Sequence, residues 1–269
     1  MKVGGKVFVV TGGGGGIGGE LVLELLRRGA KVAAVDLREE GLQEIAKRAG
    51  DKAGSLSTHA LNITDREGLV SLPDKVIEAH DSVDGLINCA GIIQPFVRVN
   101  DLDYDAIERV MNVNFYGTLY MTKTFLPFLL NRPEAHIVNV SSMGGFLPVP
   151  GQGVYGASKA AVKLLTEALY AELLDTRVHV SVVFPGATAT DIAKNSNVKT
   201  PGVNKADTAK MQARTLPADK AAKIIVRGIE RNKPQIFTGS DSKLMNRFYR
   251  LNPVFATKFI AKQMKSLLE

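Results

Sequence analysis

The chain has 269 residues, 45% hydrophobic and 23% charged, a composition typical of a globular protein with one large domain or two small ones. A single cysteine, Cys89, excludes an internal disulfide, and the four histidines lie too far apart to predict a metal site. More than half of the net charge of +7 lies after Ile236, where six Lys or Arg residues face two acidic ones, so no nucleic-acid-binding groove is expected.

Five stretches rich in valine and isoleucine alternate with helical patterns, and the expected strands are Lys6–Val10, Lys31–Val35, Leu86–Cys89, His136–Val140 and Val178–Phe184. Two weaker strands are expected near Ser57–Leu61 and at Gln235–Thr238. The expected helices are Ile17–Arg28, Glu40–Ala49, Glu67–Ala79, Tyr104–Leu130, Tyr155–Leu174 and Ala218–Arg231. This alternation predicts an α/β fold with a single-domain, doubly wound (Rossmann) parallel sheet and helices on both faces. Neither a membrane span nor a signal peptide is visible in the sequence, so a cytoplasmic protein is expected.

Two segments depart from the alternation. Residues 188–217 are polar, long and rich in loop formers, and we interpret them as a lid over a site. From Lys243 onwards, aromatic side chains interleave with Lys and Arg in a helical pattern. Such a basic amphipathic extension can lie on an anionic membrane surface, although packing on the lid or on a neighbouring subunit is the simpler interpretation. We therefore expect a main domain over residues 1–240 and an extension over 241–269.

The run TGGGGGIGG, residues 11–19, follows the first expected strand and opens the first expected helix. A helix N-terminus offers unpaired N–H groups to an anion, and glycines let a pyrophosphate approach the backbone. The G-x-G-x-x-G template fits this run in two registers. Asp36 ends the next strand, about 20 residues on, where an acidic residue binds the adenosine ribose, although alone it could be a turn residue. Together these features predict a dinucleotide site.

Tyr155 and Lys159 are four residues apart and share one face of an expected helix. A tyrosine has an unperturbed pKa of about 10, and a neighbouring ammonium favours the phenolate and lowers that value. Such a pair could act as a general base, but alone it is also an ordinary surface pair.

Five motifs occur in one order and at one set of intervals. They are Thr11-Gly12-x-x-x-Gly16-x-Gly18, Asn88-Cys89-Ala90-Gly91, VNVSS ending at Ser142, Tyr155-x-x-x-Lys159 and Pro185-Gly186. From about Lys6 to Thr238 the chain therefore resembles the short-chain dehydrogenase/reductase family. The resemblance anchors the glycine register on Thr11. It implies an oxidoreductase that transfers hydride between a nicotinamide cofactor and a secondary alcohol or ketone.

The resemblance also implies a catalytic tetrad of Asn114, Ser142, Tyr155 and Lys159. Tyr155 would be the general acid/base, Lys159 would lower its pKa and hold the nicotinamide ribose, and Ser142 would orient the substrate oxygen. Asn114 would position a water that links Lys159 to solvent, but it could equally be a structural residue that kinks the helix. Cofactor contacts are implied for Gly12, Gly16, Ile17, Gly18, Asp36, Asn62, Asn88, Ala90, Gly91, Tyr155, Lys159, Pro185, Gly186 and Thr190.

The sequence favours NAD over NADP. Asp36 would repel a 2′-phosphate, and Gly15 and Leu37 stand where NADP-dependent relatives commonly carry a basic residue. Arg38 keeps an NADP-dependent ketoreductase open as the alternative. Two positions depart from the family pattern: Cys89 replaces an asparagine that stabilises the sheet, and Asn62 replaces an acidic residue near the adenine.

The expected substrate is a hydrophobic secondary alcohol or ketone, and Gln94, Phe96 and Phe146 are expected to line its pocket. The helices over Tyr104–Leu130 and Tyr155–Leu174 resemble those through which family members form dimers and tetramers, so a homodimer or homotetramer is expected. A dinucleotide-sensing module that has lost catalysis remains an alternative, although the intact tetrad argues against it.

Overall fold

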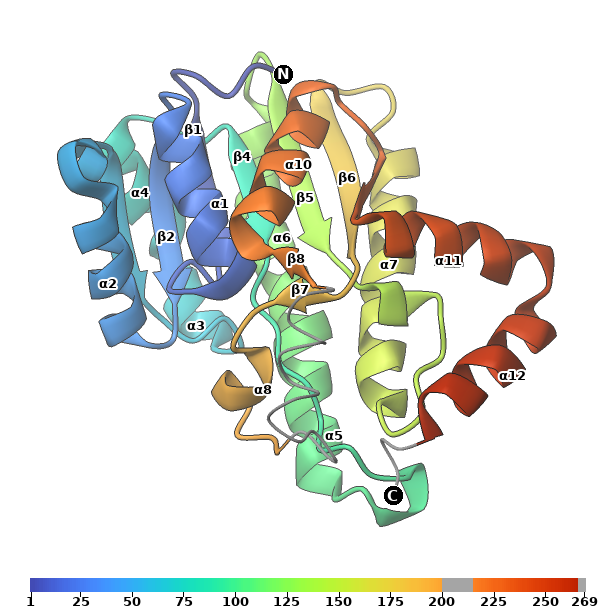
Figure 1. Ribbon diagram of the computed structural model, residues 1–269. Helices are drawn as coiled ribbons and strands as arrows, with labels where there is room; N and C mark the ends of the chain where they lie inside the picture. The colour runs from blue at the N-terminus through green and yellow to red at the C-terminus, as the bar shows by residue number, and fades with distance from the viewer. Residues whose placement is uncertain (200–214, 266–269) are drawn as a thin grey trace.

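A seven-stranded sheet forms the centre of the molecule (Figure 1). The computed structural model describes residues 1–199 and 215–265. The strands of the sheet are β1 (Val7–Thr11), β2 (Lys31–Asp36), β3 (Leu56–Ala60), β4 (Gly85–Asn88), β5 (Ala135–Val140), β6 (Val178–Pro185) and β9 (Gln235–Thr238). In space they follow the order β3-β2-β1-β4-β5-β6-β9, and every neighbouring pair runs parallel.

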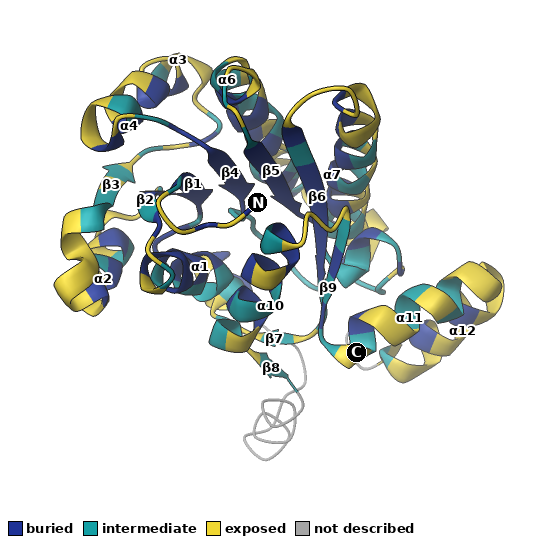
Figure 2. Ribbon diagram, turned by 90° about the horizontal axis from the view of Figure 1, so that it is seen from above, coloured by how far each residue is buried: buried dark blue, intermediate teal, exposed yellow. Residues whose placement is uncertain are grey.

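Helices cover both faces of the sheet (Figure 2). They are α1 (Gly16–Arg27), α2 (Glu39–Ala49), α3 (Arg66–Leu69), α4 (Leu72–His80), α5 (Tyr104–Met111), α6 (Thr118–Leu130), α7 (Gly153–Glu172), α8 (Ile192–Asn195), α10 (Ala218–Glu230), α11 (Ser240–Leu251) and α12 (Pro253–Gln263). Apolar side chains of α1, α2 and α10 form one buried core with the sheet, and those of α4, α6 and α7 form another. Every residue of β1, β4 and β5 is buried, as expected for strands covered on both faces. The predicted doubly wound α/β fold is confirmed.

The strand boundaries agree with the sequence to within one residue at each end, but two helices differ. The single helix expected over Glu67–Ala79 is divided into α3 and α4. Pro73 lies in the first turn of α4, where its missing N–H is tolerated, whereas inside a continuous helix it would remove a hydrogen bond. The helix expected over Tyr104–Leu130 contains a π-helical turn at Asn112–Gly117 between α5 and α6. Such turns are rare and often lie at functional sites.

The first strand has β2 on one side and β4 on the other, so the chain changes winding direction between β1 and β4. Ligands of doubly wound sheets bind at the carboxyl ends of the strands beside such a point. Thr11, the last residue of β1, ties these ends together: its buried hydroxyl accepts hydrogen bonds from the N–H groups of Cys89 (3.0 Å) and Ala90 (3.2 Å). The edge where a dinucleotide is expected is therefore held by a specific contact.

The expected lid is described only at its two ends. Two short parallel strands, β7 (Thr188–Ala189) and β8 (Leu216–Pro217), pair with each other, and α8 follows β7. Residues 200–214 lie outside the described residues, so closure over the site stays a prediction. At the far end of the chain, α11 begins directly after β9 and forms with α12 an arm that extends from the body (Figure 1).

Within the described ranges, none of the helices is long and apolar enough to cross a membrane. The same residues contain no group of three or more His, Cys, Asp or Glu side chains arranged to hold a metal ion.

Candidate cofactor and catalytic site

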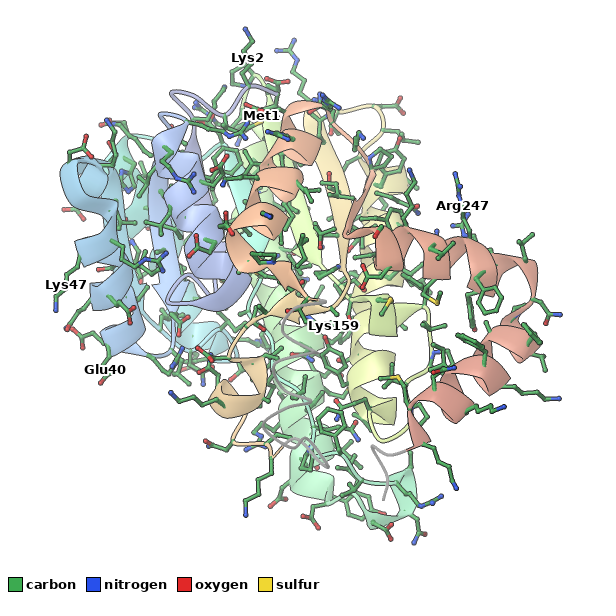
Figure 3. All side chains as sticks on the ribbon, viewed as in Figure 1. Met1, Lys2, Glu40, Lys47, Lys159 and Arg247 are labelled. Carbon is green, nitrogen blue, oxygen red and sulfur yellow. The ribbon has the colours of Figure 1, made fainter. Side chains whose placement is uncertain are left out.

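A cavity of about 290 Å³ opens at the carboxyl ends of β1, β4, β5 and β6. Twelve of the residues singled out in the sequence line it: Gly12, Gly16, Ile17, Gly18, Ala90, Gly91, Ser142, Tyr155, Lys159, Pro185, Gly186 and Thr190. Lys159 lies near the centre of the molecule in Figure 3, close to the ends of these strands. The glycine run and the Tyr155-x-x-x-Lys159 motif, which are more than a hundred residues apart in sequence, therefore border one space.

The glycine run packs too closely on neighbouring backbone at Gly12 and Gly18 to admit side chains. A Cβ atom at Gly12, whose φ is +69°, would lie 2.9 Å from the Cα atom of Ala90, and one at Gly18 would lie 2.1 Å from the Gly12 carbonyl oxygen. The first residues of α1, Gly16 and Ile17, border the cavity. No side chain caps this helix and no acidic residue stands in its first turn, so its N–H groups remain available to an anion. These residues fit the pyrophosphate of a dinucleotide.

Asp36 lies beside the same loop. Its carboxylate accepts hydrogen bonds from the N–H groups of Gly14 and Arg38, both at 3.0 Å. The Arg38 side chain lines the cavity, with its Nε atom 4.0 Å from a carboxylate oxygen of Asp36, and passes 3.7 Å from where a Cβ atom of Gly15 would be. Asp36 itself is not among the residues that line the cavity, so its contact with a ribose stays a prediction, whereas the Arg38 guanidinium borders the space.

The tyrosine of the motif is carried by the first turn of α7, and a side chain from another loop fixes that turn. Gln94 is fully buried, and its Oε1 atom accepts hydrogen bonds from the N–H groups of Val154 (2.8 Å) and Tyr155 (3.0 Å). Its Nε2 atom donates to the Gly151 carbonyl at 3.0 Å, and its own carbonyl accepts from the Gln152 side chain at 2.8 Å. Gln94 thus caps α7 from outside the helix, where the residue before the helix supplies no cap.

Ser142, Tyr155 and Lys159 meet where β5 ends. The Ser142 hydroxyl accepts a hydrogen bond from the Gly144 N–H at 3.0 Å, and the Lys159 ammonium donates to the Val140 carbonyl at 2.9 Å. Lys159 is buried, whereas Tyr155 is partly exposed towards the cavity. A substrate oxygen in this space can therefore reach a phenol and a hydroxyl together.

Burial shifts the two titrating groups in opposite directions. It raises the pKa of Tyr155 above its ordinary value, and a hydrogen bond with Ser142 opposes that rise. It also lowers the pKa of the Lys159 ammonium to about 8. Desolvation therefore dominates the pKa of Tyr155, and its lowering by Lys159 stays a prediction.

Asn114 stands in the π-helical turn and is fully buried. Its amide donates hydrogen bonds to the Ile92 carbonyl and the Ser158 hydroxyl, both at 2.9 Å, and its Oδ1 atom accepts from the Ile92 N–H at 2.8 Å. A Cβ atom on Gly91 would come within 3.0 Å of the Lys159 ammonium and 3.2 Å of Asn114 Oδ1, so both groups border the same point. These contacts give Asn114 a clear structural role, and a water relay to Lys159 stays a prediction.

Comparison with known proteins identifies the family of this chain. The family model described as short chain dehydrogenase matches residues 6–201, which is most of the chain. The chain belongs to the short-chain dehydrogenase family. Relatives include SadH of Mycobacterium tuberculosis strain H37Rv, named as an oxidoreductase, which is 34% identical over 252 residues, covering 92% of this chain and 91% of SadH.

Two solved structures of short-chain dehydrogenases have nearly the same fold and are each 25% identical to this chain. One, from Burkholderia phymatum in complex with NAD, has a TM-score of 0.82 and matches 93% of this chain and 96% of its own. The other, from Burkholderia cenocepacia in complex with NADP, has a TM-score of 0.78 and matches 98% and 99%. The family is one of NAD(P)-dependent oxidoreductases, and both cofactors occur among its structures.

The three residues expected in the substrate pocket of this short-chain dehydrogenase do not line the cavity. Gln94 is buried beneath the start of α7, as described above. Phe146 packs edge-on against Phe184, with ring centroids 5.5 Å apart, and contacts the core under α11 and α12. Phe96 is half-buried outside the cavity. The sequence pattern located the loops but not the direction of these side chains.

Two asparagines expected at the cofactor also lie elsewhere. Asn88 is buried, and its amide donates to the hydroxyl of Thr122 (3.2 Å) and to the side-chain oxygen of Asn139 (2.9 Å). Asn62 accepts hydrogen bonds from the N–H and hydroxyl of Thr64 in a local turn outside the cavity. Asn88 therefore joins neighbouring elements, which is a structural role rather than contact with the cavity.

Arg38, which the sequence connects only with the NADP-dependent alternative, also lines the cavity. The other lining residues were not predicted to contact the cofactor or substrate, and they are Gly15, Cys89, Val140, Ser141, Thr188, Asp191, Ile192 and Asn195. Several are direct neighbours of a motif, so adjacency alone could have indicated them. Ser141 also holds the site together, because its hydroxyl donates to the Lys159 carbonyl at 2.7 Å. The stretch from Thr188 to Asn195 belongs to the expected lid, and its position on the cavity supports that interpretation.

Proposed function

We propose that this short-chain dehydrogenase transfers hydride between NAD(H) and a secondary alcohol or ketone, with Tyr155 as general acid/base. The observation that carries the proposal is that Ser142, Tyr155 and Lys159 line the same cavity as the open N-terminus of α1. A helix N-terminus suited to a phosphate and a side chain suited to proton transfer therefore border one space, which supports the proposal. The alternative of a sensor without catalysis is less well supported, because Ser142, Tyr155 and Lys159 all line the cavity.

In the proposed oxidation, the Tyr155 phenolate accepts the hydroxyl proton of the alcohol while Ser142 hydrogen-bonds to the same oxygen. The bound nicotinamide supplies the hydride acceptor. Lys159, held on the Val140 carbonyl, contributes positive charge beside the phenol. In ketone reduction Tyr155 returns the proton. Enclosure of substrate and cofactor in one cavity supplies the orientation that this transfer needs.

The preference for NAD rests on Asp36. Its carboxylate would accept hydrogen bonds from ribose hydroxyls and would repel a 2′-phosphate. Arg38, which also lines the cavity, is the observation that favours the second candidate, an NADP-dependent ketoreductase. The substrate proposed is uncharged and hydrophobic, because apolar side chains such as Val140 and Ile192 border the cavity beside Ser142.

The proposed assembly is a homodimer or homotetramer in the cytoplasm. Large apolar side chains are exposed along α5, α6 and α7 and the turns beside them, which supports a subunit interface there. These side chains are Tyr104, Tyr116, Leu130, Leu164, Tyr170 and Leu174.

The test follows nicotinamide absorbance with NAD⁺ and with NADP⁺ over a panel of secondary alcohols, beside a Tyr155→Phe control. Turnover with NAD⁺ that is lost in the control supports the proposal. Preference for NADP⁺ favours the ketoreductase. Tight NAD⁺ binding without turnover of any alcohol favours the sensor, and absence of dinucleotide binding refutes all three.

A further inference from the structure

The C-terminal helices form a two-helix arm, the basic hairpin, consisting of α11 and α12. In Figures 1 and 2 this arm extends to one side of the body, away from α2 at the opposite edge of the sheet. The two helices are joined at Asn252, whose side chain caps α12 by accepting a hydrogen bond from the Phe255 N–H at 3.0 Å. The arm is therefore a defined structural element.

One face of the basic hairpin holds it to the body. The buried Ser242 hydroxyl donates to the Phe184 carbonyl at 2.8 Å. Ala256 and Ile260 of α12 form a small buried core with Leu147, which lies in the loop that follows Ser142. The hairpin thus packs on the loop that follows Ser142, and its inner apolar residues are already buried.

The other face exposes large apolar side chains to solvent. The exposed fractions are 85% for Leu251, 64% for Val254, 61% for Leu244, 55% for Phe255 and 40% for Phe259. Phe255 and Phe259 stand one helical turn apart on α12, and both rings pack edge-on against Phe248. The centroid of the Phe248 ring lies 5.6 Å from that of Phe255 and 5.7 Å from that of Phe259. A cluster of this kind on a protruding arm indicates a binding surface.

The same two helices carry five exposed cations. They are Lys243, Arg247 and Arg250 on α11 and Lys258 and Lys262 on α12. Among the described residues, no carboxylate forms an ion pair with any of these five cations. The single acidic side chain between residues 240 and 265, Asp241, accepts a hydrogen bond from the Ala187 N–H. In Figure 3 the Arg247 side chain points away from the molecule.

We propose that the basic hairpin docks on an anionic membrane surface. Phe255, Phe259 and Leu251 would enter the boundary between head groups and acyl chains, and Lys258 and Lys262 would meet the lipid phosphates. A second copy of the chain is a poorer occupant, because a symmetric contact would bring the same unpaired cations face to face. A lipid surface instead complements both the charge and the apolar side chains.

The proposal is tested by sedimenting the full chain with vesicles of phosphatidylcholine alone and of phosphatidylcholine with phosphatidylglycerol at three to one. Binding is expected to the anionic vesicles and to weaken strongly at high salt. The double variant Lys258→Gln/Lys262→Gln is expected to lower the partition coefficient about 30-fold, from the usual contribution of a basic residue near such a surface. Phe255→Ser/Phe259→Ser is expected to lower it at least as much.

A charge-matched control is Lys2→Gln/Lys47→Gln, because both residues are exposed and stand away from the arm (Figure 3). It is expected to bind the anionic vesicles as the unmodified chain does. The proposal is overturned if the chain does not bind anionic vesicles, or if the control loses binding as far as the hairpin variants do. It is also overturned if Phe255→Ser/Phe259→Ser reduces the oligomeric state in ultracentrifugation, because the occupant is then a second copy.

Discussion

Replacing Gln94 tests whether the cap on α7 positions the proposed general base. Gln94→Leu keeps the approximate size of the side chain but removes two acceptor contacts, to the N–H groups of Val154 and Tyr155, and one donor contact, to Gly151. Loss of a helix cap costs about 0.5–2 kcal/mol, and an unpaired buried polar group costs about 1–3 kcal/mol. Because the partners can rearrange in part, we expect a loss of about 2–4 kcal/mol in the free energy of unfolding.

The effect on turnover separates positioning from stability. With the start of α7 no longer fixed, we expect kcat for alcohol oxidation to fall about 10- to 100-fold while KM for NAD⁺ changes little. Gln94→Glu retains an acceptor for both N–H groups at a helix N-terminus, where a negative charge is favoured, and should restore most of kcat. The values of kcat and KM are measured well below the melting temperature of each variant. A Gln94→Leu enzyme with reduced stability and unchanged kcat would refute the reasoning.

Three further predictions concern single groups. Tyr155→Phe should lower kcat about 10²- to 10⁴-fold while NAD⁺ binding is still measured by calorimetry, and unchanged kcat would contradict a role in proton transfer. Asp36→Asn removes the charge that opposes a 2′-phosphate, so the ratio of kcat/KM for NADP⁺ to that for NAD⁺ should rise at least about tenfold; an unchanged ratio would assign the preference elsewhere. Burial lowers the pKa of His136 to about 3, so the unfolded chain binds a proton below pH 6.5 that the folded chain does not. Stability should therefore fall as the pH drops from 6.5 towards 3. Between pH 7.5 and 4.5 urea unfolding should show about 2–3 kcal/mol more loss for the unmodified protein than for His136→Gln, and equal losses would refute this assignment.

The fold was predictable because its decisive signals are local. Buried parallel strands are short apolar runs rich in valine and isoleucine, and such runs set the positions of β1, β2, β4, β5 and β6. The edge strands β3 and β9 carry a weaker signal of this kind. The break at Pro73 was missed because the apolar spacing of the helix continues across it. The π-helical turn at Asn112–Gly117 was missed because nothing in the sequence period distinguishes it from an α-helix.

The site was predictable only as far as its motifs extend. Some residues, such as Gly16, border the cavity with their backbone, and the motif alone predicts their position. The direction of a side chain depends on a partner far along the chain. Gln94 follows the Gly91 motif, yet its amide caps a helix about 60 residues later. Phe146 follows Ser142 but turns towards Phe184 and the C-terminal helices, which no local pattern shows.

The electrostatics of the site depend on the same enclosure that shapes it. In water the pKa values of tyrosine and lysine are similar, about 10 and 10.4. A lysine that keeps its charge would therefore lower the pKa of a neighbouring tyrosine and favour its phenolate. In this protein burial raises the pKa of Tyr155 and lowers that of Lys159 to about 8, so the ammonium loses its proton before the phenol does. The cavity alone therefore does not favour the ionised base. Oxidised nicotinamide carries a positive charge, so its binding in the cavity beside Tyr155 would favour the phenolate. Activation of the proposed base would then be coupled to cofactor binding.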